Sequence, residues 1–327
     1  MSTLKYIVQR LALMFMTLLI ISLICFVLVR MLPPVELPIG DPHTAIIEAQ
    51  REAKGYNKPY LVQFGIFLRD IFTRWDWGLS DKLYIGQNVA DVFKSRIPAT
   101  MIVNLYSILL SIPIGIALGI WAALKKNTWI DHAISTLTMV CISVPSFVYA
   151  FLIQYFLSFK LGWFPFLFGT TIHSEPLGNM SYFTWTYFRS MLPAVMALSF
   201  GVIAGFTRTT RAELTEVLTS EFMLLARTKG LTKTQATIRH ALKNCMVVVL
   251  PSIFGEFIGI MSGSLIIERI FSIPGVGGLY LNSINARDYP MFMMLTIFYT
   301  VVGLAASIVV DISYGFIDPR VRVGSRK

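Results

Sequence analysis

Six apolar runs, each approaching or exceeding the length needed to cross a lipid bilayer, constrain this chain more than any other feature. A spanning helix needs about 20 mainly apolar residues. The runs cover residues 11–29, 99–124, 133–159, 191–207, 245–267 and 291–310. The fourth has only 17 residues, but Tyr187 and Phe188 can extend it, and the sixth continues to Ile317 past Asp311. We therefore predict an all-α integral membrane protein with six transmembrane helices.

The composition supports this prediction and disfavours a soluble protein. Of the 327 residues, 55% are hydrophobic and 14% are charged, whereas about a quarter of the residues of soluble domains are charged. A chain of this length has too little interior to hide so much apolar surface from water. A net charge of +10 suggests nucleic acid in a polar chain, but in such an apolar one we expect no nucleic-acid partner.

The distribution of Lys and Arg predicts which way the chain crosses the membrane. Basic residues accumulate in cytoplasmic loops. If the N-terminus is inside, inner segments hold 15 basic residues and outer segments 13, nine of them in the loop 30–98. Loops longer than about 60 residues cross largely regardless of charge, which leaves 15 against 4. We expect both termini in the cytoplasm, with the first run retained as an anchor because it is longer than a signal-peptide core.

The long outer loop contains one helical pattern. Pro59 can open a helix, and apolar residues recur at helical spacing at Leu61, Phe64, Leu68, Ile71 and Trp75. This pattern predicts an amphipathic helix that lies on the membrane or on its own bundle. A docking surface for an external partner is the alternative.

The inner loop 208–244 carries seven basic and three acidic residues. Residues 221–230 read as a short helix stopped by Gly230. Thr232 or Thr234 can cap a second helix that runs to about Lys243. Such a helix–glycine–helix elbow suits docking into a groove of a partner, and a solvated basic loop is the alternative reading.

No catalytic constellation is apparent. The sequence has no GxSxG, HExxH or P-loop motif, so we expect neither an enzyme nor ATP hydrolysis by this chain. The four histidines are scattered and the three cysteines lie inside apolar runs. We therefore expect no metal and no cofactor in this chain.

Two acids interrupt the apolar runs, and one glycine-rich segment follows the fifth run. Ionisable groups inside spans are costly and often functional. Glu256 either lines a path, where it would attract a peptide amino group, or stabilises a neighbouring helix. For Asp311 we expect a structural hydrogen bond or salt bridge, with contact to the cargo as the alternative. The segment that contains Pro274, Gly275, Gly277 and Gly278 is either a tight loop or one that turns back into a cavity mouth.

Several motifs resemble those of permeases of binding-protein-dependent ABC importers, closest to the oligopeptide, dipeptide and nickel branch. They are WGLS at 77–80, RIPAT at 96–100, ARTKG at 226–230, RHALKN at 239–244, IFSIPGVGGL at 270–279, RDYP at 287–290 and the ending that runs from Asp311 to Arg320. Leu224 and Leu225 replace a Glu and an Ala of the general family, and His240 and Lys243 replace an Ile and a Pro. The peptide branch typically shows these departures.

The resemblance implies a type I ABC importer permease fold with a long outer loop after the first helix. It divides the chain into an anchor helix (1–30), an extracytoplasmic region (31–97), a transmembrane domain with a five-helix core and a coupling loop at about 208–244 (98–320), and a cytoplasmic tail (321–327). The implied location is a bacterial or archaeal cytoplasmic membrane. The implied partners are a second homologous permease, two ABC ATPase subunits that bind ATP and Mg, an external substrate-binding lipoprotein and membrane lipid.

The resemblance also implies the function and the site. The chain would form half of the pore of an oligopeptide importer, with dipeptide or nickel as alternative cargo. The ATPase-docking residues would be Glu221, Phe222, Leu225, Ala226, Arg227, Lys229, Gly230 and His240, with Phe222 and Leu225 as apolar knobs and Arg227 and Lys229 at the rim. Pro274, Gly275, Gly277 and Gly278 would form an outer gate or touch the binding protein. An ion-coupled secondary transporter that uses Glu256 and Asp311 is the alternative from another class.

Overall fold

The computed structural model describes residues 3–33, 37, 42–178 and 180–317, so the Asp318–Arg320 part of the last motif and the tail 321–327 lie outside the described residues. Five helices are long and apolar enough to cross a membrane, and a bent pair raises the number of candidate spans to six. The spans are α1 (Thr3–Met31), α4 (Val89–Leu124), α7 (Trp185–Leu218), α10 (Leu242–Gly259) and α13 (Tyr289–Ile317). The predicted all-helical membrane fold is confirmed.

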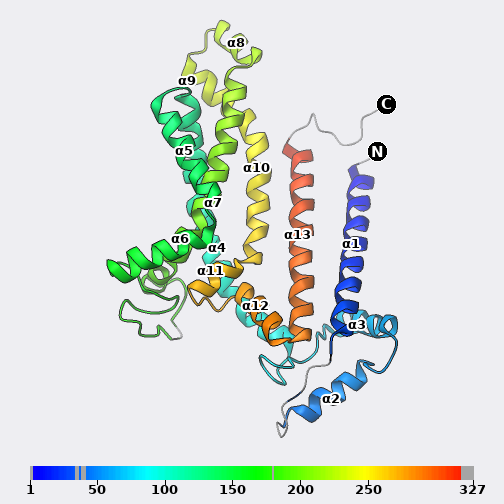
Figure 1. Cartoon of the computed structure of the whole chain (residues 1–327). Coiled ribbons are helices and arrows are strands. Elements are labelled where there is room, and N and C mark those ends of the chain that lie inside the picture. The colour runs from blue at the N-terminus through cyan, green and yellow to red at the C-terminus, as the bar shows by residue number, and fades with distance from the viewer. Residues whose placement is uncertain (1–2, 34–36, 38–41, 179, 318–327) are drawn as a thin grey trace.

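The third predicted span is not one straight helix. Residues 133–159 fall on α5 (Trp129–Ser143), α6 (Ser146–Ile153) and a π-helical segment Gln154–Lys160, with a bend of 98°. The break lies at Val144, which is extended, and Pro145. Proline has no backbone N–H and disfavours the helical conformation of the residue before it. In Figure 1, α6 therefore points sideways from the foot of α5.

The fourth and fifth predicted spans also differ from the structure. α7 continues to Leu218, so residues 208–218 are helix, whereas we expected a loop. The charge of Arg211 is tolerated there because its guanidinium donates to both carboxylate oxygens of the buried Asp131, at 2.5 and 2.8 Å. The candidate fifth span covers Lys233–Ile270 and so contains the predicted run, but its α-helix α10 ends at Gly259 and the chain turns at Gly263, where φ is 62°. It then forms α11 (Leu265–Ile270) and α12 (Val276–Ala286).

The closest helix pair at the centre of the bundle is α4 with α7. A Cβ atom on Gly115 would lie 2.8 Å from the Ile203 carbonyl oxygen, and one on Gly119 would lie 2.8 Å from that of Thr207. These two glycines, four residues apart on one face of α4, let the two backbones touch. This contact holds α4 and α7 together, and the two ends of the bundle carry different structures.

The end opposite α8 (Glu221–Thr228) carries the long first loop. It contains α2 (Thr44–Ala53) and α3 (Tyr60–Arg74), and α3 follows Pro59 and stops at Trp75 in the left-handed conformation. The ring of Phe26 in α1 lies 5.5 Å from Phe64 and 5.2 Å from Phe67. The predicted amphipathic helix is therefore confirmed, and it packs on the bundle of its own chain. We call α2, α3 and the loop 75–88 the outer lobe.

Candidate functional site

The inner elbow, residues 220–241, lies at the end of the bundle where α1 begins and α13 ends (Figure 1). α8 is followed by Gly230 with φ of 90° and by the short helix α9 (Lys233–Ala236). Thr232 caps α9 in a capping box with Gln235, and a π-helical segment Thr237–Ala241 leads into α10. The predicted helix–glycine–helix elbow is confirmed, with Thr232 as its cap. Its second arm continues without a break into the fifth span.

Two faces of α8 have different surroundings. Met223 and Ala226 are buried against the bundle. Phe222 is 41% exposed and Leu225 is 56% exposed. Exposed apolar side chains of this size at a helix surface indicate a protein or membrane contact. The elbow is thus anchored by one face and leaves apolar side chains uncovered on the other.

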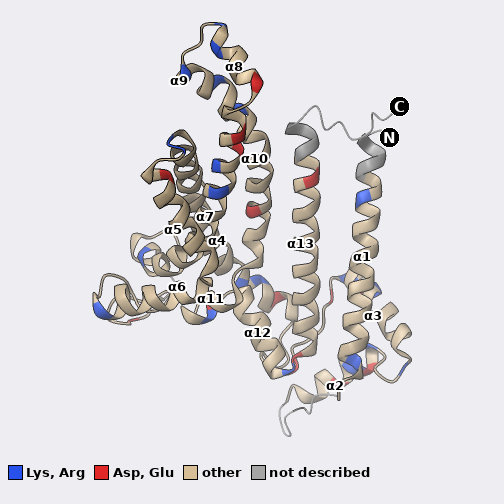
Figure 2. Ribbon diagram, turned by 45° about the horizontal axis from the view of Figure 1, so that its top comes forward, with Lys and Arg blue, Asp and Glu red and all other residues tan. Residues whose placement is uncertain are grey.

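The other residues predicted for this site lie on the same elbow. Glu221, Arg227, Lys229, Gly230 and His240 are exposed, and in Figure 2 basic residues gather on α8 and α9. Ala226 differs from the rest, because its side chain faces the bundle and not the exterior.

The Gly-rich outer segment surrounds a buried carboxylate that sequence reasoning missed. Glu268 in α11 is buried. The Thr100 hydroxyl in α4 donates to its Oε1 at 2.7 Å, and the Gly278 N–H donates to its Oε2 at 3.0 Å. Thr100 Oγ1 in turn accepts from the Val276 N–H at 2.8 Å. This network attaches the hairpin formed by α11 and α12 to α4.

The glycines of that hairpin differ in how much space surrounds them. A Cβ on Gly275 would lie 2.4 Å from Glu268 Oε2, and one on Gly277 would lie 3.0 Å from the same atom. A Cβ on Gly278 would meet nothing closer than a carbonyl oxygen at 3.8 Å. Pro274 is exposed beside them. Gly275 and Gly277 therefore allow the backbone to enclose the carboxylate, and Pro274 forms the rim.

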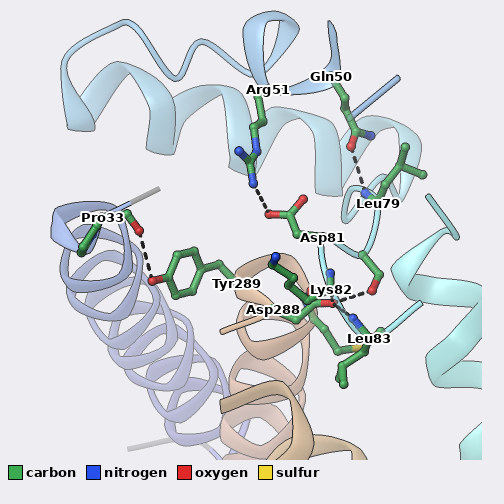
Figure 3. A network of polar contacts seen from close by, with 11 residues as sticks. Pro33, Gln50, Arg51, Leu79, Asp81, Lys82, Leu83, Asp288 and Tyr289 are labelled. Carbon is green, nitrogen blue, oxygen red and sulfur yellow. Dashed lines mark hydrogen bonds and ion pairs between the residues drawn. The ribbon is translucent and has the colours of Figure 1, made fainter. Parts of the chain in front are cut away.

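A second buried carboxylate joins two of the sequence motifs that are far apart in the chain. Asp288, between α12 and α13, accepts from the Ser80 hydroxyl at 2.5 Å and from the N–H groups of Lys82 and Leu83 at 3.1 and 3.0 Å (Figure 3). It also accepts from the Met291 N–H at 3.3 Å and so caps α13. The WGLS and RDYP motifs thus meet at one point of the outer lobe.

Neighbouring contacts extend this network across the outer lobe. The Arg51 guanidinium of α2 lies 2.8 Å from a carboxylate oxygen of Asp81, and Gln50 Oε1 accepts from the Leu79 N–H at 2.9 Å (Figure 3). Burial raises the pKa of Asp81, and the hydrogen bond and charge of Arg51 oppose that rise. The lobe therefore encloses a carboxyl whose ionised form is disfavoured by burial and only partly compensated by Arg51.

The two acids within the spans have different environments. Asp311 in α13 forms an ion pair with Arg10 in α1 at 3.1 Å, which confirms the predicted structural pairing. Glu256 in α10 is half-buried and makes no hydrogen bond or ion pair with any residue in the described part of the chain. Within that part, no three His, Cys, Asp or Glu side chains gather as metal ligands would.

Comparison with known proteins covers nearly the whole chain. A family described as binding-protein-dependent transport system inner membrane component matches residues 115–323, and the N-terminal family of such membrane components matches residues 3–104. The dipeptide transport system permease protein DppB of Lactococcus lactis subsp. cremoris is 34% identical over 98% of this chain and 99% of its own. The glutathione transport system permease protein GsiC of Escherichia coli K12 is 31% identical over 98% and 99%.

One solved structure supports the fold. A crystal structure described as an amino acid ABC transporter with histidines covers 69% of this chain and 94% of its own, with a TM-score of 0.50 and 19% identity. At that identity the likeness concerns the arrangement of helices alone. It agrees with the predicted type I permease fold.

Proposed function

The chain belongs to the family of binding-protein-dependent transport system inner membrane components, and we propose that it moves peptides through an importer in which it forms half of the pore. Membership makes it a multi-pass permease subunit of an ABC importer, a channel component and not a catalyst. Such an importer works with ATPase subunits, a substrate-binding protein and a second permease.

The inner elbow is the proposed contact with the ATPase. The observation that carries this is the exposure of Phe222 and Leu225 on a helix whose opposite face is anchored by Met223 and Ala226. A helix held in this way transmits a displacement of its exposed face to the spans as a rigid body. Its second arm runs directly into α10, so movement of the elbow would tilt the fifth span.

The proposed ATPase contact also implies an orientation of the chain in the membrane. The elbow shares its end of the bundle with the start of α1 and the end of α13, and ATPase subunits work in the cytoplasm. Both termini are then cytoplasmic, as the counts of basic residues predict. The outer lobe and the hairpin of α11 and α12 face the substrate-binding protein, with Pro274 at the exposed rim and Gly275, Gly277 and Gly278 holding the hairpin in shape.

The cargo is proposed to be a peptide with a free amino terminus. Glu256 supports this because it is a carboxylate in a spanning helix without a partner in the described part of the chain, where an ammonium group would find an opposite charge. The motifs favour oligopeptides. Some relatives are named for dipeptides and for glutathione, so the uptake of short peptides has to be tested as well.

Uptake into proteoliposomes tests this proposal. The complete importer with its binding protein should accumulate labelled pentapeptide or dipeptide only when ATP is supplied. Accumulation driven by a proton gradient without ATP would contradict it, and uptake of a nickel chelate in place of peptides would reassign the cargo. Glu256→Gln should slow uptake of a free peptide more than that of its N-acetylated form. The control Glu175→Gln, at an exposed outer position, should affect neither.

A further inference from the structure

A pocket of about 460 Å³ lies beside the inner elbow, between the ends of α4 and α7 and the helices α8 and α9. Three cationic side chains line it: Lys126 from the turn after α4, Arg227 from α8 and Lys233 from α9. No Asp or Glu is among its lining residues. None of the three cations has a carboxylate within ion-pair distance in the described part of the chain. The pocket therefore concentrates positive charge that no carboxylate of the described residues pairs with.

The hydroxyls of the pocket are already engaged, which leaves its cations as the groups that can bind a ligand. The hydroxyls of Thr219, Ser220 and Thr237 donate to the backbone carbonyl oxygens of Glu216, Val217 and Lys233. The Thr215 Oγ1 is buried away from the pocket surface and has no hydrogen-bond partner among the described residues. A group that accepts several hydrogen bonds and carries negative charge, such as a phosphate, would satisfy this lining.

The apolar side chains at the pocket indicate an amphipathic ligand. Leu124, Leu218 and Leu224 line it together with the cations, and Leu224 is 65% exposed. Trp129, at the start of α5, is 77% exposed, and tryptophan is enriched at the level of lipid headgroups. Basic pockets at the ends of spanning helices are suited to anionic headgroups.

The pocket shares Arg227 with the predicted ATPase contact, but it lies on the flank of α8 opposite the apolar side chains of that contact. Successive residues of an α-helix are rotated by about 100°, so Arg227 and Lys229 lie on opposite sides of α8. Phe222 and Leu225 lie on the flank of Lys229, whereas Leu224 and Arg227 face the pocket. A partner that covers Phe222 and Leu225 leaves the other flank accessible.

We propose that this pocket binds a phosphate group, supplied by the headgroup of an anionic phospholipid. The bound lipid would brace the inner elbow against the turn after α4. The proposal does not require the chain to carry peptides, because it depends only on the pocket and the adjoining bilayer.

Photo-crosslinking identifies the occupant. Benzoylphenylalanine at position 224 in the complete importer, reconstituted in phosphatidylcholine with 30% phosphatidylglycerol, should yield a phosphatidylglycerol adduct on illumination. With about 1 kcal/mol for each basic residue, the variant K126Q/R227Q/K233Q should bind the lipid about a hundredfold more weakly, and the adduct should disappear. The variant K125Q/R239Q/K243Q removes the same charge from exposed positions outside the pocket, and it should retain the adduct. An adduct with the ATPase instead would overturn the proposal.

Thermal unfolding separates the two sources of phosphate. In nanodiscs, phosphatidylglycerol should raise the unfolding midpoint of the complete importer, and the pocket variant should lose that shift. Inorganic phosphate added to pure phosphatidylcholine nanodiscs should leave the midpoint unchanged. A rise with inorganic phosphate that the pocket variant abolishes would overturn the lipid as the source. An equal loss of the phosphatidylglycerol shift in both charge variants would show a general surface effect and reject the site.

Discussion

The two ends of the molecule differ in whether their side chains find partners within the chain. At the outer end, buried charged groups find their partners within the chain: Asp288 accepts from Ser80, Lys82 and Leu83, and Asp81 of the outer lobe pairs with Arg51. In the inner elbow, α8 has one anchored face, and Phe222 and Leu225 remain exposed. The outer end pairs its buried polar groups within the chain, whereas the inner end leaves apolar side chains uncovered.

This difference has an energetic meaning. A buried polar group contributes to stability when every donor and acceptor around it is paired, and it is costly when one partner is removed. Substitutions in the outer lobe should therefore lower the free energy of unfolding. Substitutions on the exposed face of the elbow should leave it unchanged and alter association instead. Four predictions test this contrast.

The largest expected effect is that of Asp288→Ala. The substitution removes the acceptor shared by the Ser80 hydroxyl and the N–H groups of Lys82 and Leu83, and each buried donor left unpaired costs about 1–3 kcal/mol. We expect the free energy of unfolding to fall by ~3 kcal/mol or more, measured by thermal unfolding in detergent. Asp91→Ala, at an exposed position in α4, should change it by less than ~0.5 kcal/mol. Equal losses in the two variants would refute the role of the network.

Gly275→Ala should have the second largest effect. The added methyl group would lie 2.4 Å from both Glu268 Oε2 and Thr100 Oγ1, and overpacking of this kind costs about 1–3 kcal/mol. Gly278→Ala is the matched control, because its methyl group would find the nearest atom at 3.8 Å. The thermal unfolding midpoint of Gly275→Ala should lie clearly below that of Gly278→Ala. If Gly278→Ala lowered the unfolding midpoint more than Gly275→Ala, enclosure of the Glu268 carboxylate would not be the reason for the glycines.

A smaller effect should appear as a pH dependence at Asp81. Burial raises the pKa of this carboxyl above its ordinary value of 3.8, so the folded state holds the proton more tightly than the unfolded state does. The stability that Asp81 contributes is then fully present below the ordinary value and is lost as pH rises through the raised one. The unfolding midpoint of wild type minus that of Asp81→Asn should therefore decrease between pH 4 and pH 7. A difference that stays constant over this range would contradict the prediction.

Local features were predictable from the sequence because their causes are local. Pro59 opens α3, Gly230 ends the first arm of the elbow with a positive φ, and Thr232 caps the second. The six apolar runs locate the spans because a bilayer imposes their length. The bend at Pro145 was also encoded locally, but the apolar run continues through it and the pattern alone does not show a change of direction.

The buried carboxylates were not predictable, because their partners are far away in the chain. Glu268 binds a hydroxyl 168 residues earlier, and Asp288 binds one 208 residues earlier. Hydrophobic periodicity reports which face of an element is buried, and it carries no information on which distant loop covers that face. The motifs marked both regions as unusual, but the structure was needed to show that two of them form one contact.

The smallest expected effect on stability, and the sharpest contrast with Asp288, belongs to Phe222→Ala combined with Leu225→Ala. Both side chains are exposed, so the free energy of unfolding of the permease should change by less than ~0.5 kcal/mol. The same two side chains are the proposed knobs of the ATPase contact, where loss of an apolar anchor costs about 2 kcal/mol or more. Co-purification of the ATPase and ATP-driven uptake should therefore fail in a permease that unfolds as wild type does. Met223→Ala, on the buried face of the same helix, should lower stability as well as association, because truncating a buried methionine costs about 2–5 kcal/mol. If the double variant retained the ATPase, the exposed face of the elbow would not be the contact, and the inner end would need another reason for its uncovered apolar surface.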